Sequence, residues 1–351
     1  MRLNSAEIRR SAKAVRLLST LAALALAGPA AAHGEHSTDT DTDLARVASF
    51  FSGAQIVEGP TKVDCTLSEG AKTTCFSITV RPDPKDYTPG PWCPTNISQG
   101  AEAGGIWFLD GKAVDVDGDF ITRLAEVYGD SKWKLYDPET GDVRYTGTLE
   151  ACEAAARPDV DPQYQNHCVQ CLPEYMPEEA SVTYVIPLEP VPSTRQQPTQ
   201  RGGSGVASNG VRLDGPAPLD AILGAHTIAP FDDCGGHVNL HVGYHYHAVT
   251  DCLSPGATML NRADPEAVEA HGGQIGIAMD GHAIFPHLMA DGTEPEGLDA
   301  CYGREGEGLP YHYHVGSAGS NQILGCLAAQ TGCVLPESGM ACDASRRPPR
   351  P

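Results

Sequence analysis

The residues best suited to chemistry in this 351-residue chain are the histidines of a repeated motif. Tyr-His-Tyr-His occurs twice and contributes His245, His247, His312 and His314. In an extended strand alternate side chains point to opposite faces, so the histidines of each copy would share one face and the tyrosines would pack on the other. Neutral imidazoles are ligands for zinc, copper, iron and nickel. The pattern therefore predicts a transition-metal site in which two neighbouring strands turn all four imidazoles toward one centre.

The surroundings of the two motifs also match. A cysteine stands eleven residues before the first histidine of each motif, and each motif runs on to a Cys-Leu pair. This indicates two related strand units. One possible pairing links each unit by its own disulfide, Cys234 with Cys252 and Cys301 with Cys326, but other pairings are open.

Further histidines and carboxylates lie near the motifs. His237 and His241, in "CGGHVNLH", are candidate additional ligands or outer-shell groups. Asp233 or Asp280 is a candidate for orienting an imidazole. The remaining histidines of this half carry no comparable pattern and are expected to be structural or peripheral: His226, His271, His282 and His287.

The segments "DDCGGHVNLHVGYHYH", "IGIAMDGHAIF" and "LDACYGREGEGLPYHYHV" resemble the bacterial YHYH-domain family, named for this motif. The resemblance covers residues 203–335, and "CFSITV" and "VTYVIPLEP" resemble earlier strands of that domain, so that residues 60–335 would form one elaborated unit. It implies no particular activity. In "MDGHAIFPH" the family more often has Asp-Gly-Phe-Pro-Ile-Tyr-Gly. A pocket shaped by this loop would then take a different ligand here; the departures are His282, Ala283, Phe285 and Pro286.

The N-terminus predicts export. Five basic residues, a short apolar run and a small-residue cleavage site make residues 1–32 a secretory signal peptide, and the apolar residues usual after the pair in a twin-arginine signal are missing. Cleavage would leave His33 as a terminal chelate for copper, with His36 nearby, in an acidic flexible tail over residues 33–59. We therefore expect a periplasmic or secreted protein.

Charge and cysteine content agree with that location. Removing the signal takes away five basic residues and one acidic residue, so that the net charge falls from −21 to −25. Such a chain repels nucleic acid, and its charge either favours cations or simply keeps the protein soluble outside the cytoplasm. The expected partner is a metal or a small-molecule ligand. No later stretch is long and apolar enough to span a bilayer. All twelve cysteines follow the cleavage site, which points first to disulfides.

The rest of the chain reads as mainly β. Short apolar runs broken by Gly, Pro and Asp predict antiparallel sheets, sandwich- or barrel-like, with a few short helices and several disulfides. "GQIGIAMDGHAIF" predicts a hairpin turning at Asp280-Gly281, and "DFITRLAEVYG" a helix over residues 119–129. The expected organisation after the tail is an N-terminal strand region, which can belong to the same domain, then the YHYH core and a disordered tail: residues 60–200, 201–335 and 336–351.

Two further motifs suggest weaker sites. "DVDGDFITRLAE" places carboxylates at calcium-loop positions, Asp115, Asp117, Asp119 and Glu126, but Phe120 stands where the loop needs glycine; the alternative is an acidic turn capping a helix at Asp119. "NHCVQC", residues 166–171, is a Cys-x-x-Cys for which a structural disulfide is favoured over redox chemistry or zinc.

Three functions follow from these patterns. The first is an exported protein that binds copper or zinc through the paired His-x-His strands. The second is a metal-dependent or histidine-based hydrolase or oxidoreductase, because a three-ligand metal keeps a position open for chemistry. The third is an extracytoplasmic binding module without metal. Three protein ligands would favour the second and four would favour a closed site.

Overall fold

The computed structural model describes residues 37–157, 159–199, 203–260 and 263–346. The expected signal peptide and the copper-binding tail at His33 and His36 lie outside these residues. From Thr38 onward the chain forms one unit. The predicted boundary near residue 200 stays a prediction.

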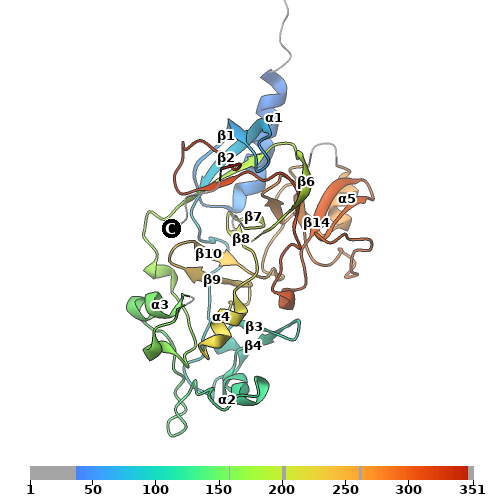
Figure 1. The fold of residues 1–351 in the computed structure, drawn as a ribbon. Coiled ribbons are helices and arrows are strands. Elements are labelled where there is room, and N and C mark those ends of the chain that lie inside the picture. The colour runs from blue at the N-terminus through green and yellow to red at the C-terminus, as the bar shows by residue number, and fades with distance from the viewer. Residues whose placement is uncertain (1–36, 158, 200–202, 261–262, 347–351) are drawn as a thin grey trace, which may run out of the picture. The chain divides into compact units, whose positions relative to one another are not determined.

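The largest sheet has eight strands in the order β13-β14-β12-β11-β7-β8-β10-β9. It consists of two halves with the same topology. Each half consists of two consecutive hairpins. The second strand of the second hairpin carries the Tyr-His-Tyr-His motif and pairs in parallel with the second strand of the first hairpin. The halves join through the antiparallel pair β7 and β11. Figure 1 labels β7 and β8 between β10 of the first half and β14 of the second. The strands of the first half are β7 Gly205–Ala207, β8 Arg212–Leu213, β9 Gly236–Asn239 and β10 Gly243–Tyr246; those of the second half are β11 Gly276–Ala278, β12 Ala283–Phe285, β13 Gly303–Gly306 and β14 Leu309–His314.

The two halves share equivalent hydrogen bonds as well as the same strand order. Asp232 accepts a hydrogen bond from the Tyr244 hydroxyl (2.8 Å), and Asp299 accepts one from the Tyr311 hydroxyl (2.8 Å). These tyrosines lie on the face opposite the histidines, as the strand alternation predicts. The chain therefore contains two copies of one strand unit.

The turns of the first hairpins are also equivalent. The predicted hairpin at Asp280-Gly281 is confirmed, and Asn209-Gly210 makes the corresponding turn in the first half. Both glycines have positive φ, +89° and +85°, which L side chains rarely adopt. The polar residue of each turn bonds the motif's second tyrosine on the adjacent strand: Asn209 donates to Tyr246 (2.9 Å), and Asp280 accepts from Tyr313 (2.6 Å).

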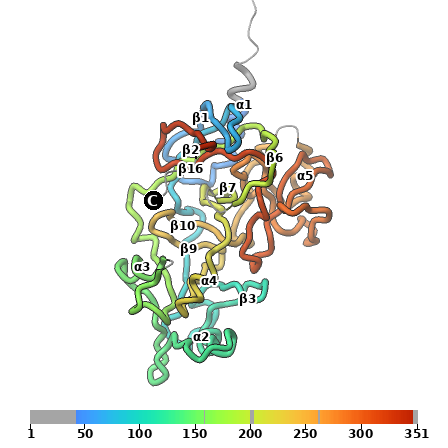
Figure 2. Tube along the Cα trace, in the orientation of Figure 1, coloured from blue at the N-terminus to red at the C-terminus, as the bar shows by residue number. Residues whose placement is uncertain are grey.

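A four-stranded antiparallel sheet joins early and late parts of the chain, in the order β1-β2-β5-β16 (Figure 2). Phe76 and Ile78 of its β2 share a buried cluster with Tyr244 and Ile277 of the large sheet. Two smaller pairs complete the strands. The bounds are β1 Ile56–Thr66, β2 Lys72–Val80, β5 Val182–Pro187 and β16 Cys333–Leu335, with the pairs β3 Ile106–Leu109 and β4 Lys112–Asp115, and β6 Pro192–Gln197 and β15 Leu327–Ala329.

The helices are few and mostly short. α2 Gly118–Val127 confirms the helix expected near residues 119–129. Together with the antiparallel sheets and six disulfides, this confirms the mainly β, disulfide-linked fold. The other helical segments are α1 Ser37–Phe50, α3 Leu149–Ala155, α4 Leu219–Gly224 and α5 Pro265–Ala270, with the single turns η1 Phe51–Gly53, η2 Ala101–Ala103, η3 Pro162–Tyr164, η4 Pro173–Tyr175 and η5 Ala318–Ser320.

The two predicted terminal tails need correction. Within residues 33–59, α1 and the start of β1 replace the expected flexible tail, because Val47 and Phe50 lie on one helical face and are buried in the core. At the other end, the Cys333–Cys342 disulfide and an isolated parallel β-bridge between the main chains of Asp343 and Thr66 hold residues 336–346 to the sheet.

All twelve cysteines form disulfides. Cys234–Cys252 closes a loop in the first half, and Cys301–Cys326 closes the equivalent loop in the second half. Of the pairings that the sequence leaves open, the one with a disulfide inside each unit is therefore confirmed. The remaining pairs are Cys65–Cys75, Cys93–Cys168, Cys152–Cys171 and Cys333–Cys342.

Candidate metal centres

The first half of the large sheet brings together His237, His245 and His247. One ring nitrogen of each lies within 4.8 Å of the others. His237 on β9 is the register partner of His245 on β10, so that the antiparallel pairing itself places the two rings on one face. Because a carbonyl only accepts, the Nδ1 of His245 donates to Gly243 (3.0 Å) and that of His247 to Gly215 (2.6 Å). Both Nε2 atoms are thereby left as lone-pair donors facing the centre.

These imidazoles are held neutral. Burial lowers the pKa of His237 well below its ordinary value, with His245 and His247 adding to the effect. Burial, then the neighbouring His245, lowers the pKa of His247 to about 3. A neutral imidazole with its Nδ1 hydrogen bonded is the form that ligates metals.

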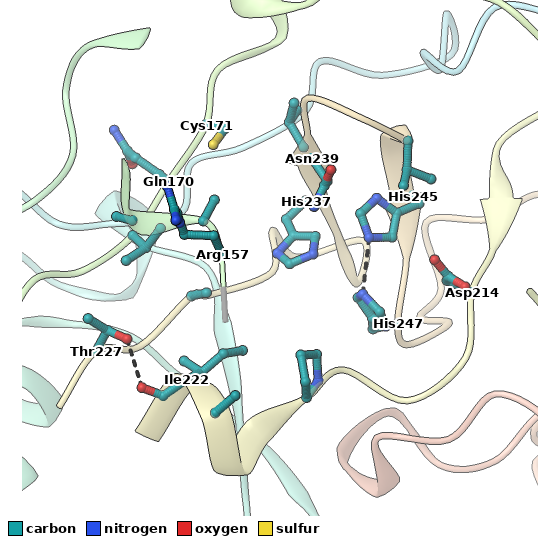
Figure 3. A pocket seen from close by; sticks show the side chains of 18 of the residues that line it. Arg157, Gln170, Cys171, Asp214, Ile222, Thr227, His237, Asn239, His245 and His247 are labelled. Atoms are coloured by element: carbon teal, nitrogen blue, oxygen red, sulfur yellow. Dashed lines mark hydrogen bonds between the residues drawn. The ribbon is translucent and has the colours of Figure 1, made fainter. Parts of the chain in front are cut away.

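A cavity of about 310 Å³ opens on the first triad (Figure 3). His237, His245 and His247 line one part of it, with Asp214 next to them. His245 and His247 are only 4% and 7% exposed, whereas His237 is partly exposed. The first triad thus faces a space that a small molecule can enter.

The second half forms a second triad, His271, His312 and His314, whose ring nitrogens also lie within 4.8 Å of one another. Each Nδ1 donates to a main-chain carbonyl: to Ala267 (2.7 Å), Pro310 (2.8 Å) and Pro286 (2.7 Å), respectively. Within the described part of the chain, all three Nε2 atoms are buried and have no hydrogen-bond partner. Buried polar atoms in proteins are rarely left in this state.

The second triad is more enclosed than the first. All three of its histidines are 0% exposed, and the ring of Phe285 lies 5.2 Å from that of His312. Burial lowers the pKa of His312 and of His314 to about 4, so that both are neutral near pH 7. Glu307 lies outside this cluster of donor atoms: its Oε2 is 3.6 Å from Nε2 of His271, and its Oε1 pairs with Arg304 (2.7 Å).

The expectation of one shared centre is wrong. Each motif strand pairs within its own half, and in the strand order β8, β7, β11 and β12 lie between β10 and β14. Figure 1 shows β10 and β14 well apart. Five inter-strand spacings amount to roughly 24 Å along the sheet. His245 and His247 therefore meet a third histidine of their own half, and so do His312 and His314.

The third histidine of the second triad is one that the sequence does not single out. His237 is the register partner of His245, but Arg304 is the register partner of His312. His271, expected to be structural or peripheral, fills the third place from the C-terminal end of α5. No spacing in the sequence connects it with the motif 40 residues later.

The other predicted site residues lie elsewhere. His241 is exposed beyond the end of β9, outside the triad. Main-chain carbonyls, rather than Asp233 or Asp280, orient five of the six triad imidazoles, all but that of His237. The Asp280 carboxylate instead lies 3.2 Å from Nδ1 of His282, a histidine outside both triads. His226 and His287 contact Asp130 (2.8 Å) and the carbonyl of Val315 (3.1 Å).

The two weaker motifs have structural roles. Asp117, rather than Asp119, caps α2 by accepting from the Phe120 N–H (2.8 Å). Calcium binding by this loop stays a prediction. The cysteines of the Cys-x-x-Cys pair with separate partners, Cys168 with Cys93 and Cys171 with Cys152, so that the favoured structural disulfide is confirmed.

Fold and sites together define a disulfide-linked, mainly β protein with a duplicated histidine-bearing strand unit. The family model described as YHYH protein matches residues 183–297, which confirms the YHYH-family resemblance over this segment. The match includes the first triad and His271 and ends before β13. Comparison with curated proteins and with solved structures gave no match. Among the described residues, none of the helices is long and apolar enough to cross a membrane.

Proposed function

We propose that this protein binds a transition-metal ion at each histidine triad, outside the cytoplasm. One observation carries the proposal: the second triad turns three buried Nε2 atoms without hydrogen-bond partners, among the described residues, toward one another.

The physical argument rests on the tautomer. Each Nδ1 carries the proton because it donates to a carbonyl, so each Nε2 presents a lone pair. Three converging lone pairs repel one another, and each buried atom left unpaired costs about 1–3 kcal/mol. A cation at the centre removes both penalties. Carbonyls that fix Nδ1–H are the usual outer shell of a metal-bound histidine.

Zinc and copper suit these donors. Imidazole nitrogens favour zinc, copper, iron and nickel over calcium or magnesium, and the cysteines offer no thiolate because all of them form disulfides. In the first triad Nε2 of His245 lies 3.1 Å from Nε2 of His247. Two nitrogens about 2.05 Å from a tetrahedral zinc ion would lie about 3.3 Å apart, close to that separation.

An extracytoplasmic location is supported by the disulfides. Six disulfides are typical of oxidising compartments such as the periplasm or the cell exterior. The signal peptide expected over residues 1–32 supports the same location.

A second candidate function is catalysis at the first triad. The second triad is fully buried, as in closed structural sites. The first triad has three nitrogens and faces a cavity of about 310 Å³, as in metal sites that keep a position open for substrate. This favours metal-dependent hydrolysis or oxidation over a purely structural role there.

Metal analysis of protein purified from the periplasm tests the proposal. We expect two equivalents of zinc or copper in the wild type, one in His245→Ala, one in His312→Ala and none in the double variant. The exposed His241→Ala is the matched control and should keep both equivalents. A wild type without stoichiometric metal, or metal that survives the double substitution, would refute the proposal.

A further inference from the structure

The cavity over the first triad is lined by apolar and polar side chains that metal binding alone does not require. We propose that it binds a small organic anion with an apolar, ring-sized body, whose carboxylate takes the open position of the metal. This inference rests on the proposed metal binding at the first triad.

Access distinguishes the two triads. His237 is partly exposed and lines the cavity with His245 and His247, so that the centre of the first triad faces the cavity. In the second triad all three histidines are 0% exposed. Only the first centre therefore combines three protein ligands with room for an exogenous one.

The size and lining of the cavity select the body of the ligand. At about 310 Å³ it lies at the lower end of the volumes of small-molecule pockets, which suits a molecule with one ring. Its walls are largely apolar, so that an aromatic or alicyclic body would be desolvated favourably. The apolar lining includes Trp92, Val169, Ile222, Ala229, Val238 and Val242.

Charge selects the head group. Three neutral imidazoles leave the charge of a divalent cation uncompensated. Among the described residues that line the cavity, Asp214 is the carboxylate, and Arg212 offsets its charge: its Oδ1 accepts from Arg212 (2.9 Å) and from the Gly215 N–H (2.8 Å). A ligand carboxylate would supply negative charge at the metal's open position, where burial strengthens the attraction.

The polar lining favours an anion for a second reason. The side-chain oxygens of Gln170 and Asn239 already accept hydrogen bonds from the main-chain N–H groups of Cys93 (3.2 Å) and His241 (2.9 Å). The amide NH₂ groups, which only donate, remain for a ligand. Arg157 also lines the cavity, but Asp159 already pairs with its guanidinium (2.8 Å).

Cobalt spectroscopy with benzoate as the probe tests the inference. The His312→Ala protein, loaded with one equivalent of Co²⁺, carries only the first triad. We expect benzoate to change its d–d absorption saturably, because a carboxylate enters the coordination sphere. His245→Ala, which carries only the second triad, is the matched control and should show no change. Neutral benzyl alcohol should bind His312→Ala at least tenfold more weakly than benzoate.

A cavity variant separates ligand binding from metal binding. Gln170→Glu keeps an acceptor for the Cys93 N–H and adds negative charge. In the His312→Ala background it should retain Co²⁺ and weaken benzoate binding at least tenfold; Ile222→Trp, which fills the cavity, should do the same by sterics. One bound Co²⁺ with no benzoate response, or an equal response from the second triad, overturns this inference alone. Failure to bind Co²⁺ at the first triad overturns both this inference and the proposed function there.

Discussion

Nε2 of His245 lies 3.1 Å from Nε2 of His247, while the Nδ1 atom of each ring donates to a main-chain carbonyl. The two facing atoms are therefore both acceptors, and neither ring has a proton to place between them. Burial holds the pKa of both rings below the ordinary value, so that protonation near pH 7 does not resolve the conflict. A metal ion does resolve it, because it bonds to both lone pairs at once.

Metal removal is expected to lower thermal stability. An ion bound only by the folded state, at a free concentration 100 times its Kd, adds about 2.7 kcal/mol per site to the free energy of unfolding. Stripping the purified protein with a chelator should therefore lower Tm by several degrees, and added Zn²⁺ should restore it, as measured by calorimetry.

The control for metal removal is the double variant His245→Ala and His312→Ala, which should melt at the same temperature with and without chelator. If the wild type is equally insensitive, the protein is the metal-free binding module that the sequence also allows.

Replacing His271 is expected to empty the second triad. His271→Ala should lose one of two metal equivalents, because only two imidazoles remain there. Its affinity loss should exceed the 10- to 100-fold typical of outer-shell changes. His282→Ala is the matched control, since His282 contacts Asp280 and lies outside both triads. Metal content is measured by elemental analysis; two equivalents in His271→Ala would show that this ring is no ligand.

The sequence predicts the motif strands and their faces well, because alternation is a local property. Tyr244 and Tyr246 are buried on the face opposite His245 and His247, as expected. The equivalence of the two units is also a local feature of the sequence, because Cys234 and Cys301 each lie eleven residues before the first histidine of their motif.

The number of centres could not be predicted from the sequence. It depends on which strands join the halves, and a pairing of β7 with β11 is a non-local choice that no spacing encodes. His271 was missed because it follows a helix and reaches the site only through the fold. The helix α1 could not be predicted because its first half, "STDTDTD", is acidic and polar. Its apolar face, which includes Val47 and Phe50, lies in the second half alone.

Each disulfide of the duplicated units is expected to support its own triad. Cys301→Ala with Cys326→Ala opens a link between residues 25 apart and should cost about 3 kcal/mol, measured by urea denaturation. Because Cys301 immediately precedes the β13–β14 hairpin, metal affinity should fall at the second triad alone.

The matched variant is Cys234→Ala with Cys252→Ala, which should weaken metal binding at the first triad alone. Equal losses at both centres from either variant would show that the two units do not act independently.

Close packing between a glycine and a tyrosine is expected to matter more in the first unit than in the second. A Cβ at Gly236 would lie 2.2 Å from the Tyr244 hydroxyl, and one at Gly303 would lie 2.0 Å from the Tyr311 hydroxyl. Both hydroxyls donate to an aspartate, but Tyr244 is 0% exposed and its ring has no room to move aside, whereas Tyr311 is only partly buried.

Gly236→Ala should therefore lower the free energy of unfolding by about 1–3 kcal/mol, the usual cost of overpacking, and weaken metal binding by the adjacent His237. Gly303→Ala should cost less, because the ring of Tyr311 can shift toward solvent. Gly224→Ala, where an added Cβ meets nothing within 4 Å, should be neutral in urea denaturation. A larger loss of unfolding free energy in Gly303→Ala than in Gly236→Ala would contradict this prediction. The shorter contact at Gly303 would then matter more than the deeper burial of Tyr244.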